Sequence, residues 1–231
     1  MSPVSSVVLV HGAWANGSSW DKIIPILKAH GLHVSAVHLT LSSFALDVAA
    51  TARIIDTQEG PVLLVGHSYG GAVNTEAGNN PKVVGLVYIA APAPDVGEGA
   101  TTLNGNYPAA DAFAEFRDIG DGHIQLTERG IKEYFAQDLS PAEKELLVAT
   151  QGVTNGAVFQ TPVSKPAWKT KPSWYVVAGN DKTIQPEQQR DTAKLINAKT
   201  ITAVGSSHVP MLSQPEKVAD FILEAVKSLN G

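Results

Sequence analysis

Short runs of consecutive apolar residues alternate along the chain with longer stretches in which apolar positions recur every three or four residues. The short runs are rich in valine and isoleucine, which predicts buried β-strands, and the longer periodic stretches predict amphipathic helices. Six strands are expected, at residues 7–10, 33–37, 62–65, 83–89, 173–177 and 200–204. Five helices are expected, at residues 19–30, 44–57, 69–78, 186–196 and 214–229.

This alternation predicts an α/β fold. Strands that are apolar on both faces and separated by helices form a mostly parallel sheet, here of about six strands, with helices on both faces. The alternation stops at residues 91–171, where loops predominate and short helices are expected at 109–116, 127–139 and 141–151. We therefore expect residues 1–231 to form a single domain that carries a mainly helical cap insertion at about 91–171.

One of the short helices has a clear start signal. Ser140 is placed to cap the helix, Pro141 occupies the first helical position, and Glu143 occupies the third. A glutamate at the third position can bind the backbone amide of the capping serine. Inserted helices at the carboxyl edge of a parallel sheet commonly form the wall or lid of a pocket.

Composition excludes several classes of function. The net charge of −5 and the lack of a long Lys/Arg block argue against binding to nucleic acid or to an anionic membrane. The absence of cysteine excludes disulfides, a thiol nucleophile and cysteine-ligated metals, and no H-x-x-x-H spacing indicates a metal site. No cleavable signal or membrane-spanning run is evident, so we expect a cytoplasmic protein. We also expect a small-molecule substrate and no cofactor. The oligomeric state is left open.

The sequence Gly66-His67-Ser68-Tyr69-Gly70 lies between a predicted strand and a predicted helix. A serine at such a sharp turn adopts a strained backbone conformation that lifts its hydroxyl clear of the sheet, and flanking glycines leave room for it. The five-residue pattern alone occurs by chance at an appreciable rate. In this context, however, Ser68 is the candidate nucleophile.

A serine hydroxyl needs a base, usually a histidine oriented by a carboxylate. Among seven histidines His208 is preferred, because it follows the last predicted strand and so lies at the same sheet edge as Ser68. Asp181 follows the preceding strand and is preferred as the carboxylate over Asp95. The order Ser68, Asp181, His208 matches the order of one hydrolase architecture and differs from those of trypsin-like and subtilisin-like enzymes.

The other histidines have weaker claims. His30, His33 and His38 flank an early helix and strand, and His67 is expected to pack or to form a hydrogen bond within the turn. His123 lies in the insertion, where a surface position is favoured over contact with substrate.

Acyl transfer also requires donors for the oxyanion. Tyr69 offers its amide at a helix start, and the loop after the first strand offers that of Ala13, with Trp14 as the alternative. Trp14 and Met211 are expected near the substrate pocket, although Met211 fits packing in the core equally well. Other aromatic residues could also line an apolar acyl pocket under the insertion, but most of them are expected in the core: Trp20, Phe113, Phe116, Tyr134, Phe135, Phe159 and Trp168.

With these residues identified, the chain resembles the α/β-hydrolase superfamily through HGAW at 11–14, GHSYGG at 66–71, AGND at 178–181 and SSHVPML at 206–212. Within it the chain is similar to a compact group of plant methylesterases, hydroxynitrile lyases and small bacterial esterases. The resemblance implies Ser68 as nucleophile, His208 as base, Asp181 as its partner, and Ala13 and Tyr69 as oxyanion donors.

The resemblance also narrows the reaction. Lyases of this group that use an acid-base lysine carry it directly after the catalytic histidine, where this chain has Val209. Some lyases carry threonine or asparagine at the position of Gly12. We therefore expect a serine hydrolase that cleaves a carboxylic ester or lactone through an acyl-enzyme. A hydroxynitrile lyase and a low-turnover ligand receptor are the alternatives.

Overall fold

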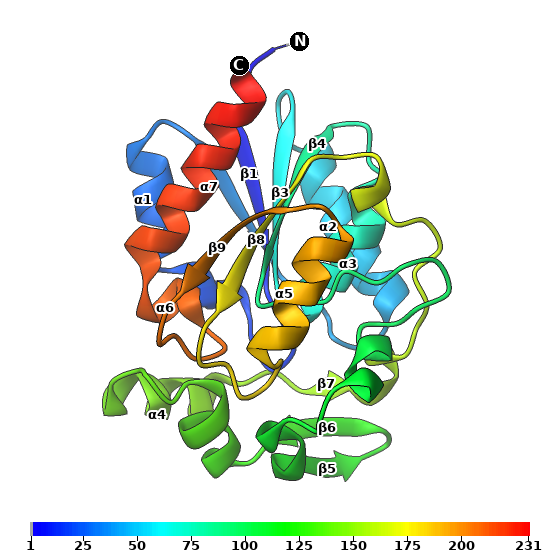
Figure 1. The fold of residues 1–231 in the computed structure, drawn as a ribbon, viewed down its shortest axis with the longest axis vertical. Coiled ribbons are helices and arrows are strands. Elements are labelled where there is room, and N and C mark those ends of the chain that lie inside the picture. Colours follow the sequence, from blue (N-terminus) through cyan, green and yellow to red (C-terminus); the bar gives the residue numbers. More distant parts are fainter. Residues whose placement is uncertain (1) are drawn as a thin grey trace.

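Six parallel strands form one sheet in the order β2-β1-β3-β4-β8-β9 (Figure 1). The computed structural model describes residues 2–231. The strands are β1 (Ser6–Val10), β2 (His33–Val37), β3 (Val62–His67), β4 (Val83–Ile89), β8 (Ser173–Ala178) and β9 (Lys199–Ala203). The expected parallel α/β sheet is therefore confirmed, and every strand lies within two residues of its predicted bounds.

Helices cover both faces of the sheet (Figure 1). The helices that follow the strands of this sheet are α1 (Ile23–Ala29), α2 (Phe44–Asp56), α3 (Tyr69–Ala77), α5 (Pro186–Leu195) and α7 (Pro215–Asn230). Helices α1 and α7 lie side by side on one face, and α2 and α3 lie side by side on the other. The strands β1 and β3 between them are fully buried, as their continuous apolar sequences require.

One predicted helix is interrupted, and the last one, predicted at 214–229, is present as α7. The expected helix at 19–30 is split into a 3₁₀ turn, Gly17–Trp20, and α1, and the turn is capped by the side chain of Asn16. The last helix is preceded by the short helix α6 (Pro210–Ser213). Each of these last two helices has a proline at its first position, where the missing amide costs nothing.

The inserted segment, residues 91–171, contains helix α4 (Pro141–Thr150) with the predicted capping box of Ser140 and Glu143, together with the turns Thr102–Asn106, Asp111–Glu115, Gly130–Phe135, Gly156–Phe159 and Ala167–Lys169. It also contains a small antiparallel sheet that the pattern did not predict, formed by β5 (Phe116–Gly120), β6 (His123–Leu126) and β7 (Thr154–Asn155). The part of the inserted segment that contains α4 and the strands β5–β7 lies across the carboxyl ends of the strands of the main sheet, and the last part runs back along the side of the molecule to the start of β8 (Figure 1).

The β5–β6 hairpin is specified by its turn. Gly120, Asp121 and Gly122 all have positive φ, and the Gly-Asp-Gly sequence suits that conformation. None of the helices in residues 2–231 is long and apolar enough to cross a lipid bilayer.

Candidate active site

Ser68 lies between the end of β3 and the start of α3, with φ 51° and ψ −129°. This conformation is strained for a residue with a side chain. It is possible because the neighbouring glycines allow the chain to pack closely: a Cβ on Gly66 would lie 2.5 Å from the Gly70 carbonyl oxygen, and one on Gly70 would lie 2.6 Å from that of Val10. The turn predicted around Ser68 is therefore present, and neither glycine can be replaced without a clash.

Asp181 and His208 form a buried pair at the same edge of the sheet. Asp181 follows β8 and His208 follows β9, and the His208 Nδ1 atom lies 2.7 Å from Asp181 Oδ2, with both side chains fully buried. Because the carboxylate accepts the proton on Nδ1, the free lone pair of the neutral ring is on Nε2. Within residues 2–231 that nitrogen makes no hydrogen bond. The pair can therefore accept a proton at Nε2.

The Asp181 carboxylate binds four donors. Its Oδ1 atom accepts the amides of Thr183 at 2.7 Å and Ile184 at 3.0 Å. Its Oδ2 atom accepts His208 Nδ1 and also Nε2 of Gln189, at 2.6 Å. Sequence reasoning missed Gln189. Its spacing from Ala193 and Ile196 on the buried face of a helix was the available signal, since a buried amide requires partners.

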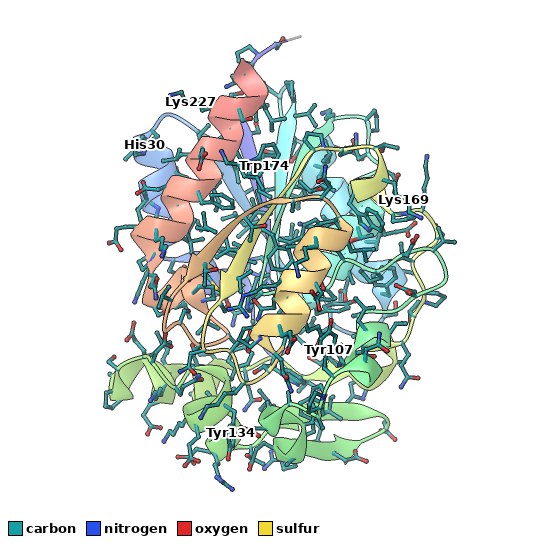
Figure 2. All side chains as sticks on the ribbon, viewed as in Figure 1. His30, Tyr107, Tyr134, Lys169, Trp174 and Lys227 are labelled. Atoms are coloured by element: carbon teal, nitrogen blue, oxygen red, sulfur yellow. The ribbon has the colours of Figure 1, made fainter. Side chains whose placement is uncertain are left out.

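The rival carboxylate and the other histidines lie elsewhere. Asp95 is partly exposed and pairs with Lys169, which lies at the outer edge of the molecule (Figure 2). His30 is exposed at the end of α1, His33 begins β2, and His123 begins β6 in the inserted segment. The part of the chain that the structure describes contains no group of three His, Asp or Glu side chains suited to a metal ion.

The two predicted oxyanion donors have free amides. Tyr69 is the first residue of α3, where an N–H has no partner within the helix. The Ala13 amide makes no hydrogen bond to any group of residues 2–231, whereas the amide of Trp14, the alternative donor, binds Thr154 Oγ1 at 3.1 Å. The loop lies against the serine, because a Cβ on Gly12 would be 2.7 Å from the Cβ of Ser68. Ala13 is thus the residue of this loop with a free donor.

The side chain of Tyr69 is anchored by a buried carboxylate that sequence reasoning did not identify. The Tyr69 hydroxyl donates to Asp47 Oδ2 at 2.9 Å, and Asp47 Oδ1 accepts the amides of Thr40 and Leu41. Burial and the Asp47 charge both raise the pKa of Tyr69, which keeps the phenol protonated. The start of α3 is therefore fixed by the hydrogen bond that Tyr69 donates to a residue in α2.

Two further histidines adjoin the site and are neutral. Nδ1 of His11 donates to the Gly12 carbonyl at 2.8 Å, and its Nε2 accepts the Leu39 amide at 3.0 Å. Nε2 of His67 donates to the His208 carbonyl at 2.8 Å, and the two rings lie 4.8 Å apart. Burial lowers the pKa of His11 to about 4 and holds that of His67 well below its ordinary value. Both rings therefore act as fixed hydrogen-bond groups.

Acid is expected to destabilise the fold through His11. Between pH 6.5 and about 4 the unfolded chain binds a proton that the native ring does not, so the free energy of unfolding falls as pH falls. The expected slope is about 1.4 kcal/mol per pH unit, or about 3.5 kcal/mol over the whole range. Urea unfolding at several pH values measures it.

The variant His11→Gln should show a shallower slope than the wild type over the same range. His30→Gln changes an exposed histidine and serves as the matched control. An unchanged slope in His11→Gln would mean that the native ring takes up the proton without cost.

A cavity of about 460 Å³, including its opening to solvent, lies beside Ser68. No charged residue lines it, and its wall includes five aromatic side chains, Trp14, Tyr69, Phe113, Phe116 and Phe159. The prediction that Trp14 lies near the pocket agrees with this wall. The three phenylalanines come from the inserted segment and occupy the pocket wall, the less favoured of the two positions expected for them.

Met211 does not line this cavity. Its side chain is fully buried in α6, within the main hydrophobic core. The sequence left both the pocket and the core open for Met211, and in the structure Met211 lies in the core. The reason is that α6 begins at Pro210, two residues after His208, and turns the following side chains into the interior.

The inserted segment holds the loops of the site in place. Trp14 has φ 57°, and its amide, carbonyl and indole N–H bind Thr154 Oγ1, the Gly152 amide and the Ile124 carbonyl. On the other side, the Phe135 carbonyl accepts the His208 amide at 3.2 Å, and the Phe135 ring packs edge-on against the imidazole. These contacts support the strained conformation of Trp14 and the placement of His208.

Asp138 adds a further contact between the inserted segment and the histidine loop. Its Oδ2 atom accepts the amide of Ser207, the residue before His208, at 3.0 Å. Tyr134, four residues earlier, marks this part of the inserted segment in Figure 2.

Comparison with known proteins places the geometry in context. The sequence model of the Alpha/beta hydrolase family matches residues 7–221. The chain is 27% identical over 249 residues to a pyrethroid hydrolase of Sphingobium wenxiniae, covering 96% of this chain and 87% of that protein. It is 28% identical over 256 residues to salicylic acid-binding protein 2 of Nicotiana tabacum, covering 96% and 97%.

Solved structures agree on the fold. Polyneuridine aldehyde esterase superposes with a TM-score of 0.83 at 22% sequence identity, covering 96% of this chain and 99% of the other. Tomato methylketone synthase I, in complex with 2-tridecanone, superposes with a TM-score of 0.84 at 17% identity, covering 99% and 100%. At these identities the comparison establishes a common fold.

Proposed function

Because the chain belongs to the alpha/beta hydrolase family, we propose that it is a cofactor-independent serine hydrolase that cleaves a carboxylic ester or lactone. The observation that carries the proposal is the buried pair of His208 and Asp181, formed at the sheet edge where Ser68 has the strained conformation of a nucleophile. Relatives named as a pyrethroid hydrolase and as a methylesterase support an ester as the substrate.

The proposed reaction passes through two half-reactions. Nε2 of His208 takes the hydroxyl proton of Ser68 as the oxygen attacks the ester carbonyl, and the amides of Ala13 and Tyr69 bind the oxyanion. The imidazolium then gives its proton to the leaving alcohol, which leaves an acyl ester on Ser68. A water molecule, deprotonated by the same nitrogen, attacks this ester and releases the carboxylic acid.

The surroundings of His208 give each step a physical basis. Asp181 accepts four hydrogen bonds, which hold the carboxylate in place to stabilise the imidazolium that forms in each half-reaction. Catalytic hydrogen bonds are often long before substrate binds, so the free Nε2 of His208 is compatible with this role. The residue after His208 is the buried Val209. Valine has no acid-base group, which supports hydrolysis over a lysine-assisted lyase reaction.

The cavity supports an uncharged substrate. A wall of aromatic rings with no charged side chain offers no partner for an ionic group, and desolvating an unpaired charge is costly. We propose that residues 91–171 act as a cap of a single domain, because their phenylalanines form much of this wall.

Covalent labelling tests the proposal. A fluorophosphonate is expected to phosphonylate Ser68 and to stop hydrolysis of p-nitrophenyl esters at a stoichiometry of one label per chain. Peptide mass spectrometry identifies the labelled residue, and a short-chain ester should protect it from the reagent. Label on a different serine, or full inhibition with Ser68 unmodified, would contradict the assignment.

A further inference from the structure

Gln189 binds the same carboxylate oxygen as the imidazole of His208. Its side chain is fully buried in the first turns of α5, and its Nε2 atom lies 2.6 Å from Asp181 Oδ2. The His208 Nδ1 atom lies 2.7 Å from that oxygen. One oxygen of the carboxylate is therefore shared between a neutral amide and the histidine.

The orientation of the Gln189 amide is fixed by two other contacts. The Ala178 amide, at the end of β8, donates to Gln189 Oε1 at 2.8 Å. The Nε2 atom also donates to the Ile184 carbonyl at 2.6 Å. Rotating the amide by 180° would bring its NH₂ group against the Ala178 N–H and its oxygen against two acceptors. The NH₂ group must therefore face Asp181.

This arrangement satisfies the carboxylate completely. The two oxygens of an ionised carboxylate offer about four acceptor positions. The amides of Thr183 and Ile184 occupy Oδ1, while Gln189 and His208 occupy Oδ2. Gln189 thus leaves a single direction from which the imidazole can approach, and so fixes the ring. As a donor it also withdraws electron density from Oδ2, which weakens the hold of the carboxylate on a proton at His208.

We propose that Gln189 is a positioning residue that orients Asp181 and lowers the basicity of His208. The inference rests on the proposed function, because it assigns His208 the role of base. Through Gln189, the helix α5 would extend to lower pH the range in which His208 can act as a base.

Two substitutions separate this role from simple packing. Gln189→Met keeps much of the volume but removes the donor, and it leaves the Ala178 amide without its acceptor. Gln189→Glu keeps an acceptor for the Ala178 amide but presents a second carboxyl group to Asp181. It therefore changes the contact with Asp181 while the hydrogen bond from the Ala178 amide is retained. If Gln189 had only a structural role, the His208 pKa would change more in Gln189→Met, which loses the hydrogen bond of the Ala178 amide, than in Gln189→Glu.

The proposal predicts a different order. The imidazolium pKa of His208, measured by NMR on isotope-labelled histidine, should rise by about one unit in Gln189→Met and by more in Gln189→Glu. The rise follows because loss of the donor, and then an added negative charge, each stabilise the protonated ring. The same order should appear in the acidic limb of the kcat/KM profile for a p-nitrophenyl ester.

Other groups near the pair are the same in every variant. His67 packs against the His208 ring, with its pKa held low by burial. The pKa of Tyr175 is raised by burial and by the Asp181 charge. Asp138 binds the Ser207 amide from the inserted segment. Gln188→Met is the matched control, since the neighbouring Gln188 is buried in α5 but binds Asn104. It should leave the His208 pKa unchanged.

The outcomes distinguish this inference from the function on which it rests. A His208 pKa unchanged in both Gln189 variants, or equally raised in Gln188→Met, overturns the role of Gln189. The NMR titration needs no substrate, so it decides this point even for a protein without esterase activity. Failure of the wild type to hydrolyse esters or to be labelled at Ser68 would instead refute the proposed function.

Discussion

The variant Ser68→Ala is expected to lose about 10⁴- to 10⁶-fold in kcat/KM for any ester that the wild type cleaves. The reason is that alanine has no oxygen to form the acyl-enzyme, while the oxyanion donors and the cavity remain. The affinity for a non-hydrolysable ligand should therefore change little. Steady-state rates on a panel of p-nitrophenyl esters, together with fluorophosphonate labelling of the same preparations, measure the effect.

Ser228→Ala is the matched control, because Ser228 is exposed on α7 and its replacement should leave the rate unchanged. The informative result is the residual activity of Ser68→Ala. A rate within tenfold of the wild type would mean that His208 activates water directly, without a covalent intermediate. Circular dichroism of both variants excludes unfolding as a cause, since removing the strained side chain should not destabilise the turn.

The second large effect is expected for Asp181→Asn, with a loss of about 10⁴-fold in kcat, as the change selects the wrong histidine tautomer. The amides of Thr183 and Ile184 require a carbonyl oxygen at the Oδ1 position. The asparagine NH₂ group must then face His208 Nδ1 and Gln189 Nε2, which donate to that position in the wild type. To avoid two facing donors the imidazole must move its proton to Nε2, where it blocks proton transfer from Ser68.

Asp95→Asn tests the rival carboxylate in the same assay. Asp95 is partly exposed and paired with Lys169, away from His208, so its variant should retain the wild-type rate. NMR of the histidine ring nitrogens would show the change of tautomer in Asp181→Asn directly. Equal losses in the two variants would mean that the carboxylates act through stability or net charge.

The parts of the site that follow from the sequence are those that depend on short-range pattern. The strands that end near Ser68 and Asp181 contain continuous apolar runs, and the strand before His208 is rich in β-branched residues. In a parallel sheet their carboxyl ends must meet at one edge. Once the strands are recognised, the loops that follow them are brought together. The meeting of His208 with Asp181 could therefore be predicted without knowledge of any side-chain packing.

The cavity could not be predicted in this way, because it depends on contacts between distant parts of the chain. The Trp14 amide binds Thr154, which is 140 residues away in sequence, through a small sheet with strands of two to five residues. Such short strands carry too little periodicity to be recognised. The pattern therefore favoured the core for Phe113, Phe116 and Phe159 because they are hydrophobic. In the structure these side chains line the cavity.

Gln189 was missed for another reason. Its helix was predicted with nearly correct bounds, but the pattern of apolar positions does not by itself mark a glutamine as buried. Burying an amide without partners is costly, so a polar residue on the apolar face of a helix indicates a specific contact. Asp47, which anchors Tyr69 from the buried face of α2, carries the same signal.

The position of Trp14 gives the protein an intrinsic optical probe. Of the four tryptophans, Trp14 alone lines the cavity, where its ring packs 5.1 Å from that of Phe116 and 5.8 Å from that of Phe159. Its indole N–H is fixed on the Ile124 carbonyl, so the ring cannot turn away when a ligand enters. Indole emission depends on local polarity, and a ligand that displaces water from this face changes it. Binding of a compound that is never cleaved can thus be followed by fluorescence, independently of catalysis.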